Sequence, residues 1–274
     1  MAGPFAPLAT VLYADDFDGG LQGWTGLIGN YEGSLDAMLP PYRDLRPPML
    51  SNATVWDTGT GGSASGTYAL KLATRPVRGS LAVGIKRLTY RHAGLLQLET
   101  LFAFKPEATE LQLSEAEVGA VGLLLDLQNE SERVMPHLRY LNAEGGEPVG
   151  RWQYKSRGPE LQRIGASGKT RSHFHLGPGG WADVPGGEQR LCYNEIATKL
   201  NWHYLRVGFD LGTMAFTGMQ CNDRCFDLAA VEPMRLPAMA NLWCMLNVAF
   251  FAEAGSDRRA FLYLDSVVLS AEIP

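Results

Sequence analysis

The sequence has neither the charge nor the long apolar runs that mark several large classes of protein. Its 274 residues carry 24 Lys and Arg against 29 Asp and Glu, a formal net charge of -5. A protein that binds nucleic acid needs a basic stripe to contact phosphates, and the sequence has none. The longest apolar run, Leu242 to Ala252, is interrupted by Asn247 and falls well short of the ~20 residues that span a bilayer. We therefore expect neither a nucleic acid nor a membrane as partner.

A secretory signal and a cysteine framework are also missing. Residues 1–7 lack the basic and apolar regions of a signal peptide, which predicts a cytoplasmic protein. The four cysteines stand at positions 192, 221, 225 and 244, and an even number permits two disulfides. However, Cys221 and Cys225 have a C-x3-C spacing, which differs from the C-x2-C of zinc and redox sites. We favour buried free thiols.

Glycine, proline and aromatic residues are abundant instead. The chain has 31 Gly, 16 Pro and 10% aromatic residues, and 46% of its residues are hydrophobic. Such a chain can bury enough surface to fold, which excludes intrinsic disorder. The composition is typical of many short strands joined by tight turns.

Alternation of apolar and polar residues dominates the pattern. Between positions 203 and 211, for example, Leu205, Val207 and Phe209 alternate with polar neighbours. Comparable segments lie at 12–17, 68–73, 81–89, 95–104, 118–128, 137–142, 149–154, 215–221, 242–251 and 261–270. The nearest approach to a helix is a short turn at Leu191–Leu200. The sequence therefore predicts an all-β protein, a single antiparallel two-sheet sandwich over residues 1–274.

Two long segments break the alternation. Residues 29–66 contain Pro40-Pro41 and Pro47-Pro48, and residues 156–189 contain two Gly-rich runs. Structureless segments of this length are usually binding loops or lids, and packed surface covering is the alternative. The glycines at 59–66 precede a strand, whereas phosphate binding requires a helix N-terminus, so we exclude a phosphate loop.

Three segments together resemble a known superfamily. They are the opening Leu12–Phe17 with Gly23-Trp24, the hairpin from Trp202 to Asn222, and the closing Phe261–Leu269. These segments are similar to the entry strand, the laminin-G-like hairpin and the closing strand of the concanavalin A-like lectin/glucanase superfamily. The resemblance implies a jelly roll whose first and last strands are neighbours. The chain departs from the pattern at Asp223-Arg224, where the hairpin turn usually reads Asn-Gly, and in the insert at 156–189.

The resemblance implies a glucanase motif of the type E-x-D-x-E, and this motif is absent. Glu115-Ala-Glu117 comes nearest, but it precedes its strand and lacks the third acid. Standard glucanase chemistry, which needs two paired carboxyl groups, is therefore not expected. If the chain is nevertheless a glycoside hydrolase or lyase with another acid/base set, the candidate catalytic residues are Asp126, His137, Glu195 and Asp210.

Alternation also predicts a polar outer face suited to sugar hydroxyls, which need paired donors and acceptors. Besides Asp126 and His137, its members are Gln128, Arg139, Arg151, Gln153, Tyr204, Arg206, Gln220 and Asn247. Aromatic surfaces for stacking on a sugar would come from Trp152, Trp181, Tyr193 and Trp243. We therefore expect a saccharide-binding protein with its ligand on the concave face, beneath the 156–189 insert. A structural or assembly module is a further alternative, because any solvated sheet face alternates in this way.

Two pairs of residues suggest metal ligands, although the sequence requires no cofactor. Asp16 and Asp265 would converge if the first and last strands are neighbours, and jelly rolls of this kind often hold a structural calcium there. Two capping or turn aspartates are the alternative. His173 and His175 would share one face of a strand, but no third ligand accompanies them, so surface histidines are the simpler interpretation. The sequence does not indicate an oligomeric state.

Overall fold

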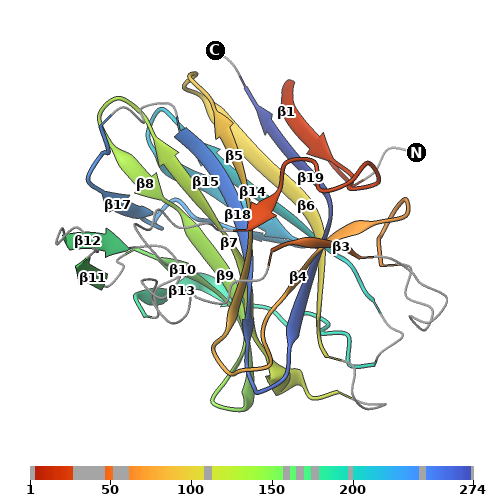
Figure 1. Cartoon of the computed structure of the whole chain (residues 1–274). Coiled ribbons are helices and arrows are strands. Elements are labelled where there is room, and N and C mark those ends of the chain that lie inside the picture. The colour runs from red at the N-terminus through yellow and green to blue at the C-terminus, as the bar shows by residue number, and fades with distance from the viewer. Residues whose placement is uncertain are drawn as a thin grey trace.

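A computed structural model describes residues 4–26, 47–51, 62–107, 113–156, 161–164, 170–173, 179–196, 200–240 and 245–272. Two antiparallel sheets stack face to face in these residues (Figure 1). The predicted all-β, two-sheet sandwich is therefore confirmed. Trp243 and His175 of the predicted ligands, and most of the 29–66 segment, lie outside the described residues.

The first sheet has eight strands. Their spatial order is β16 (Arg224–Phe226), β15 (Ala215–Cys221), β14 (His203–Asp210), β6 (Leu95–Pro106), β19 (Ala260–Ala271), β4 (Ala69–Ala73) and β3 (Met49–Ser51), and β1 (Thr10–Asp15) also pairs with β19. Thr10 lies opposite Ala271, so the first and last strands are neighbours, as the resemblance implies.

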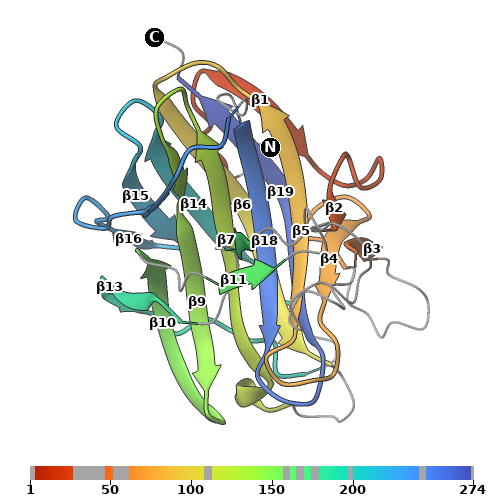
Figure 2. The same ribbon diagram turned by 60° about the vertical axis from the view of Figure 1, so that its left-hand side comes forward.

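The second sheet has nine strands. Their order is β13 (Trp181–Glu188), β10 (Glu147–Lys155), β9 (His137–Glu144), β7 (Val118–Gln128), β18 (Met245–Ala254), β5 (Leu81–Thr89) and β2 (Thr25–Gly26), while β8 (Arg133–Met135) pairs with β7, and β17 (Met234–Leu236) pairs with β8. A separate hairpin joins β11 (Leu161–Ile164) to β12 (Thr170–His173), and a 3₁₀ turn, η2 (Glu115–Glu117), precedes β7. In Figure 2, β11 passes in front of β7, on the side of this sheet away from the other sheet.

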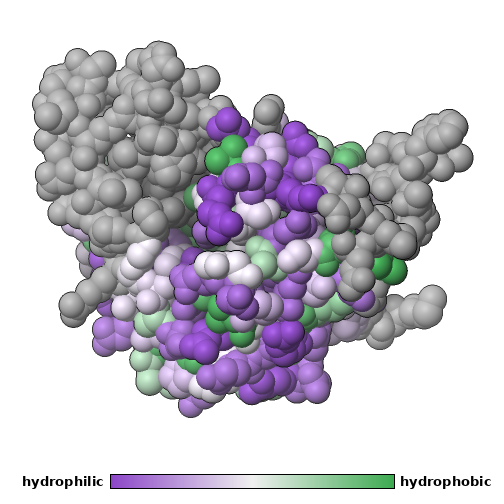
Figure 3. All heavy atoms as spheres, turned by 90° about the horizontal axis from the view of Figure 1, so that it is seen from below, coloured by the Kyte–Doolittle hydropathy of each residue, from purple (hydrophilic) through white to green (hydrophobic). Residues whose placement is uncertain are grey.

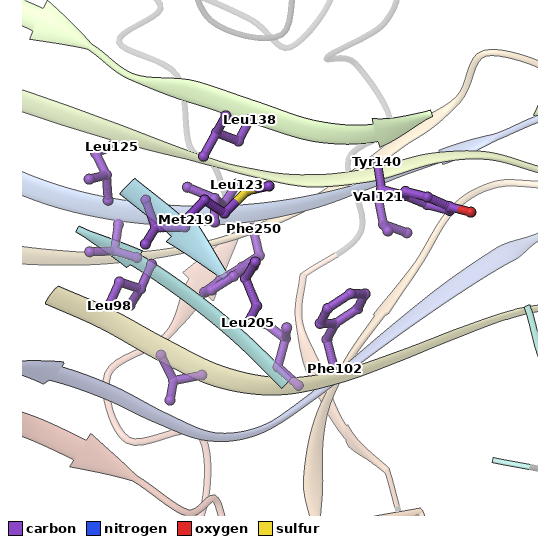
Figure 4. Packing of buried hydrophobic residues seen from close by; sticks show 14 of the residues in the cluster. Leu98, Phe102, Val121, Leu123, Leu125, Leu138, Tyr140, Leu205, Met219 and Phe250 are labelled. Carbon is purple, nitrogen blue, oxygen red and sulfur yellow. The ribbon is translucent and has the colours of Figure 1, made fainter. Parts of the chain in front are cut away.

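The core fills the space between the two sheets because each strand turns its apolar set inward. Figure 4 shows Leu98, Phe102 and Leu205 of the eight-stranded sheet facing Val121, Leu138 and other side chains of the nine-stranded sheet. On the face that Figure 3 shows, the described residues are mostly hydrophilic, with apolar residues scattered in small groups. Within the described residues, no helix is long and apolar enough to cross a membrane.

Two expectations about irregular segments need correction, and a third is only partly described. The 156–189 segment contains β11, β12 and β13, so it is not a structureless loop. Pro185 and Gly186 lie inside β13. A proline can stand there because β13 is an edge strand and its register with β10 shifts between Arg151 and Gln153. The 29–66 segment contains the three-residue β3, and because most of it lies outside the described residues, the expected loop there stays a prediction. The described part of the expected helical turn, residues 191–196, is not helical.

Candidate functional site

The predicted polar residues do not share one face, because the structure divides them between the two outer faces of the sandwich. Arg206 lies opposite Gln220 in the eight-stranded sheet, whereas Arg139 lies opposite Gln153 in the nine-stranded sheet. In both sheets the residues next to them in sequence are core residues, so these polar side chains point away from the core. The expectation of a single ligand-binding face is therefore corrected. The two sets lie on opposite sides of the molecule.

Two of the predicted aromatic platforms are tied to the core, one of them fully buried and the other half-buried. Trp152 is 1% exposed and lies in the core, where its Nε1 donates to Gln189 Oε1 at 2.9 Å. Alternation explains this position, because Arg151 and Gln153 occupy the outer face on either side of it. Tyr193 packs against the core and donates its hydroxyl to the Leu113 carbonyl.

Three of the four candidate catalytic residues serve local structure. Asp126 accepts two hydrogen bonds from Arg133, each 2.8 Å long, and both side chains are largely buried. Asp210 accepts from the backbone of Gly212 and Thr213 and so caps the turn after β14. Glu195 Oε2 accepts a hydrogen bond from the Cys192 thiol at 3.7 Å.

The fourth candidate, His137, lies next to a different group of residues. It is fully buried, its Nδ1 lies 2.8 Å from the Met135 carbonyl oxygen, and its ring meets the edge of Trp181 at 6.1 Å between centroids. Two further predicted ligands lie nearer the other end of the same face. The Gln128 side-chain amide donates a hydrogen bond to the Met239 carbonyl and accepts one from the Met239 N–H. Asn247 of β18 lies opposite Asp126 of β7 in the sheet.

The remaining pair of the eight-stranded sheet lies around a buried carboxylate. Tyr204 donates its hydroxyl to Glu99 Oε1 at 2.6 Å, and Arg206 lies opposite Glu99 in register. Burial and the Glu99 carboxylate raise the pKa of Tyr204 well above its usual value. The backbone of Ala6 also donates to Glu99, so the N-terminal segment contacts this face.

The aspartates expected to bind calcium are instead used in turns. Asp265 is fully buried, and its Oδ2 accepts from the backbone N–H groups of Ala64 and Ser65 at 2.6 and 2.9 Å. Asp16 is exposed and accepts from Gln22. N–H donors around a carboxylate do not fit a calcium site, which needs further oxygen ligands. Within the described residues, no three His, Cys, Asp or Glu side chains are arranged to hold a metal.

Hydrogen-bonded side chains cross β9, β10 and β13 on the outer face of the nine-stranded sheet. Arg139 donates Nε to Gln153 Oε1 at 2.9 Å, and Gln153 donates Nε2 to Asp183 Oδ1 at 2.8 Å. Arg151 donates to the other oxygen of Asp183 at 2.5 Å. One residue from each of three adjacent strands is thus held in a row, in which each side chain fixes the orientation of the next.

Trp181 joins this row to two cations. The Arg139 guanidinium carbon lies 4.3 Å from the centroid of the Trp181 ring, and Lys155 Nζ lies 4.8 Å from it. Both distances are those of cation–π contacts. Glu253 Oε2 is 3.6 Å from Arg139 NH1. We call the six residues Arg139, Gln153, Lys155, Trp181, Asp183 and Glu253 the Trp181 cluster.

The cluster borders an apolar part of the same face. Leu81, Val83, Ile85, Leu124, Ala249 and Phe251 form a buried group, separate from the main core, against which Trp181 packs. A Cβ at Gly122 would lie 2.7 Å from Phe251 Cζ and 2.9 Å from Arg139 Cα, closer than real Cβ atoms approach. Glycine at this position therefore lets the Phe251 ring lie against β7 beside Arg139.

Burial changes the proton affinity of the charged residues in the cluster. Burial and, to a smaller extent, the Arg139 guanidinium lower the pKa of Lys155 to about 8, and the Glu253 carboxylate acts in the opposite direction. Burial also lowers the pKa of Arg139 and raises that of Glu253. In contrast, the hydrogen bond from Gln153 lowers the pKa of the exposed Asp183. The cluster therefore contains an amine that titrates near neutrality beside a permanent cation.

Sequence reasoning identified Arg139, Gln153 and Trp181 but missed the other three members. Lys155 continues the alternation of Arg151 and Gln153 by one step, so its position on the outer face was available from the pattern. Glu253 follows Phe251 in the same way. Asp183 could not be placed on this face from the pattern, because the segment that forms β13 is expected to be a loop.

Comparisons with known proteins identify one family and several solved structures of low sequence identity. A family model with the description "Domain of unknown function (DUF6772)" matches residues 3–273. No curated protein matches the sequence.

Solved structures that are similar include an endo-β-1,4-glucuronan lyase from the fungus Trichoderma reesei, with 10% identity, a TM-score of 0.43 and 96% of each chain covered. Another is the lectin UEA-II complexed with galactose, with 8% identity, a TM-score of 0.40, and 76% of this chain and 89% of that chain covered. A third is the carbohydrate recognition domain of Emp46p in its metal-free form, with 9% identity, a TM-score of 0.36, and 83% and 89% covered. These likenesses assign neither a ligand nor a role to any residue of this chain.

Proposed function

Because the chain belongs to the DUF6772 family, whose description names no activity, we propose its function from the site itself: the outer face of the nine-stranded sheet binds a saccharide at the Trp181 cluster. We also propose that the sandwich is a concanavalin A-like jelly roll. The pairing of β1 with β19 and the β14–β15 hairpin, which contain the residues of the resemblance, support that assignment.

The observation that carries the proposal is the row Arg139–Gln153–Asp183. A sugar hydroxyl both donates and accepts, so its binding site needs donors and acceptors side by side. The row offers guanidinium and amide N–H donors and carboxylate and amide acceptors at three adjacent strands, which lie ~4.8 Å apart. The hydrogen bonds within the row hold these groups in place before a ligand arrives, which reduces the entropy lost on binding.

The proposal is tested by glycan-array binding of the intact protein, followed by calorimetry with the best oligosaccharide. Gln153→Ala should weaken binding by about tenfold, because a neutral hydrogen bond and the orientation of Arg139 are both lost. The matched control is Gln220→Ala, which removes the same amide from the outer face of the other sheet. Equal affinity of both variants and wild type would place the ligand elsewhere, and a protein that binds no glycan would refute the proposal.

A second candidate is a carbohydrate-cleaving enzyme of the lyase type. The observation in its favour is Lys155, whose pKa near 8 suits proton transfer at neutral pH. Incubation of the protein with acidic and neutral polysaccharides, followed by a reducing-end assay, tests this candidate. Release of new reducing ends that Lys155→Met abolishes would support it, and absence of cleavage with intact binding would leave the binding function alone.

A further inference from the structure

The segment before β1 lies on the outer face of the eight-stranded sheet without joining that sheet. Residues 4–9 belong to no strand, and we call them the strap. The Ala6 N–H donates to Glu99 Oε1 at 2.8 Å, and the Ala6 carbonyl accepts from Gln97 Nε2 at 2.8 Å. Two side chains of β6 therefore bind both hydrogen-bonding groups of one residue of the strap backbone.

The sequence of the strap is typical of an extended peptide ligand. Residues 4–7 read Pro-Phe-Ala-Pro, with two prolines in P-x-x-P spacing. Proline fixes its own φ and disfavours a helical conformation in the residue before it, so the backbone groups of such a segment are left for a partner. The rings of Phe5 and Tyr204 meet edge to face, 6.0 Å between centroids. Proteins recognise proline-rich segments by aromatic side chains in this way.

Few contacts hold the strap in place. Four of its six residues are exposed, all but Phe5 and Leu8. Besides the two hydrogen bonds of Ala6, the Leu8 N–H donates to Ser270 Oγ at 3.0 Å. A segment with little buried surface and exposed hydrogen bonds opens at a low free energy compared with the sheet beneath it.

The strap also leaves its main partner incompletely satisfied. Glu99 is fully buried, and both Tyr204 and Ala6 donate to its Oε1. Among the described residues, Glu99 Oε2 has no hydrogen-bond partner. A buried acceptor without a partner is costly, so the strap does not use all the binding capacity of this carboxylate. Another ligand can therefore compete with it.

We propose that the face around Glu99 is a binding site for an extended, proline-rich peptide, and that the strap fills this site from within the same chain. A peptide that presents an aromatic and a small residue between two prolines repeats the contacts of Phe5 and Ala6 when the strap lifts away. An occupant on the same chain competes at high effective concentration, so only a peptide that outcompetes the strap is bound. The site and the Trp181 cluster lie on opposite sides of the molecule, so this inference is independent of the proposed saccharide binding.

The test measures peptide binding before and after the strap is loosened. The probe is the hexapeptide Pro-Phe-Ala-Pro-Leu-Ala, the sequence of the strap, with a fluorescent label at its N-terminus and an amide at its C-terminus. The strap variant carries Phe5→Ala, which removes the ring contact, and Ala6→Pro, which removes the N–H that Glu99 accepts. By fluorescence polarisation, we expect this variant to bind the probe about tenfold more tightly than wild type does. Thermal unfolding checks that it folds, and Phe5→Ala alone replaces it if it does not.

Further substitutions in the strap variant locate the probe. Gln97→Ala removes the donor to the backbone carbonyl and should weaken probe binding about fivefold. Glu99→Gln replaces a charged acceptor by a neutral one and should weaken it about tenfold. The matched control is Gln220→Ala, which removes an amide from the same face, where it donates to the Asn222 carbonyl. The control should leave the affinity unchanged.

Three results would overturn the inference. Equal affinity of wild type and the strap variant, or equal effects of Gln97→Ala and Gln220→Ala, would show that the probe binds elsewhere. A folded strap variant that binds no probe at millimolar concentration would show that the strap only covers the surface. An oligosaccharide that binds the strap variant in place of the probe would assign the uncovered face to a sugar. Saccharide binding at the Trp181 cluster is tested separately through Gln153→Ala, so the two proposals fail independently.

Discussion

Gly122 is a residue at which a single methyl group should disturb the site and the fold together. Its Cβ would lie 2.4 Å from the Leu138 carbonyl oxygen as well as against Phe251, so β7 and β9 would have to separate. We expect Gly122→Ala to lower the free energy of unfolding by about 2–3 kcal/mol, the usual cost of overpacking. Urea denaturation measures this change.

The control for Gly122 is Gly19→Ala, because the nearest atom to a Cβ at Gly19 is 4.0 Å away. That variant should stay within about 0.5 kcal/mol of wild type. If both variants unfold at the same urea concentration, the close packing of Phe251 against β7 does not constrain the sheet.

Lys155 gives a residue-scale prediction about pH. Its folded pKa of about 8 lies below its ordinary value of 10.5, so between these pH values the unfolded chain holds more protons than the folded one. Stability contributed by Lys155 therefore rises as pH increases from 8 to 10.5. Arg139 on β9 lowers this pKa and Glu253 on β18 raises it.

The measurement is the difference in unfolding free energy between wild type and Lys155→Met across this pH range. A difference is needed because burial raises the pKa of both Cys221 and Tyr140 to about 12, which makes stability fall with rising pH in both proteins. A difference that stays constant from pH 8 to 10.5 would contradict the depressed pKa of Lys155.

At the scale of the element, Gln189 links the two sheets at the end of β13. It accepts a hydrogen bond from Trp152 of β10 and donates to the Cys221 carbonyl of β15 at 3.1 Å. Gln189→Met should destabilise the protein by about 1–3 kcal/mol, because the buried Trp152 N–H and Cys221 carbonyl both lose their partner. Denaturant unfolding checks this, with the half-buried Gln97→Met as the control, because that variant loses only a solvent-exposed hydrogen bond to the Ala6 carbonyl. Equal stability of the two variants would show that the link is dispensable.

Strands were predictable where apolar and polar residues alternate without interruption, and they were not predictable at the edge of a sheet. Residues 118–128 and 215–221 form strands with the predicted bounds, because each strand has one apolar face to bury. β13 contains Pro185 and two glycines, which signal a loop unless the partner strand is known. The site shows the same limit. Alternation tells which side chains leave the core, but only strand order tells that Arg139 and Arg206 leave it in opposite directions.

At the scale of the whole molecule, the central strands of both sheets come from the last part of the chain. β18 lies between β7 and β5, and β19 lies between β6 and β4 and also pairs with β1. A ribosome makes these strands after every one of their partners. Neither sheet can form completely until residues 245–271 have left the ribosome. Until then, the edges and apolar faces of the earlier strands stay uncovered. Synthesis from one end to the other thus exposes this protein to aggregation until its final strands arrive, and a nascent chain that stalls before β18 would be a substrate for chaperones.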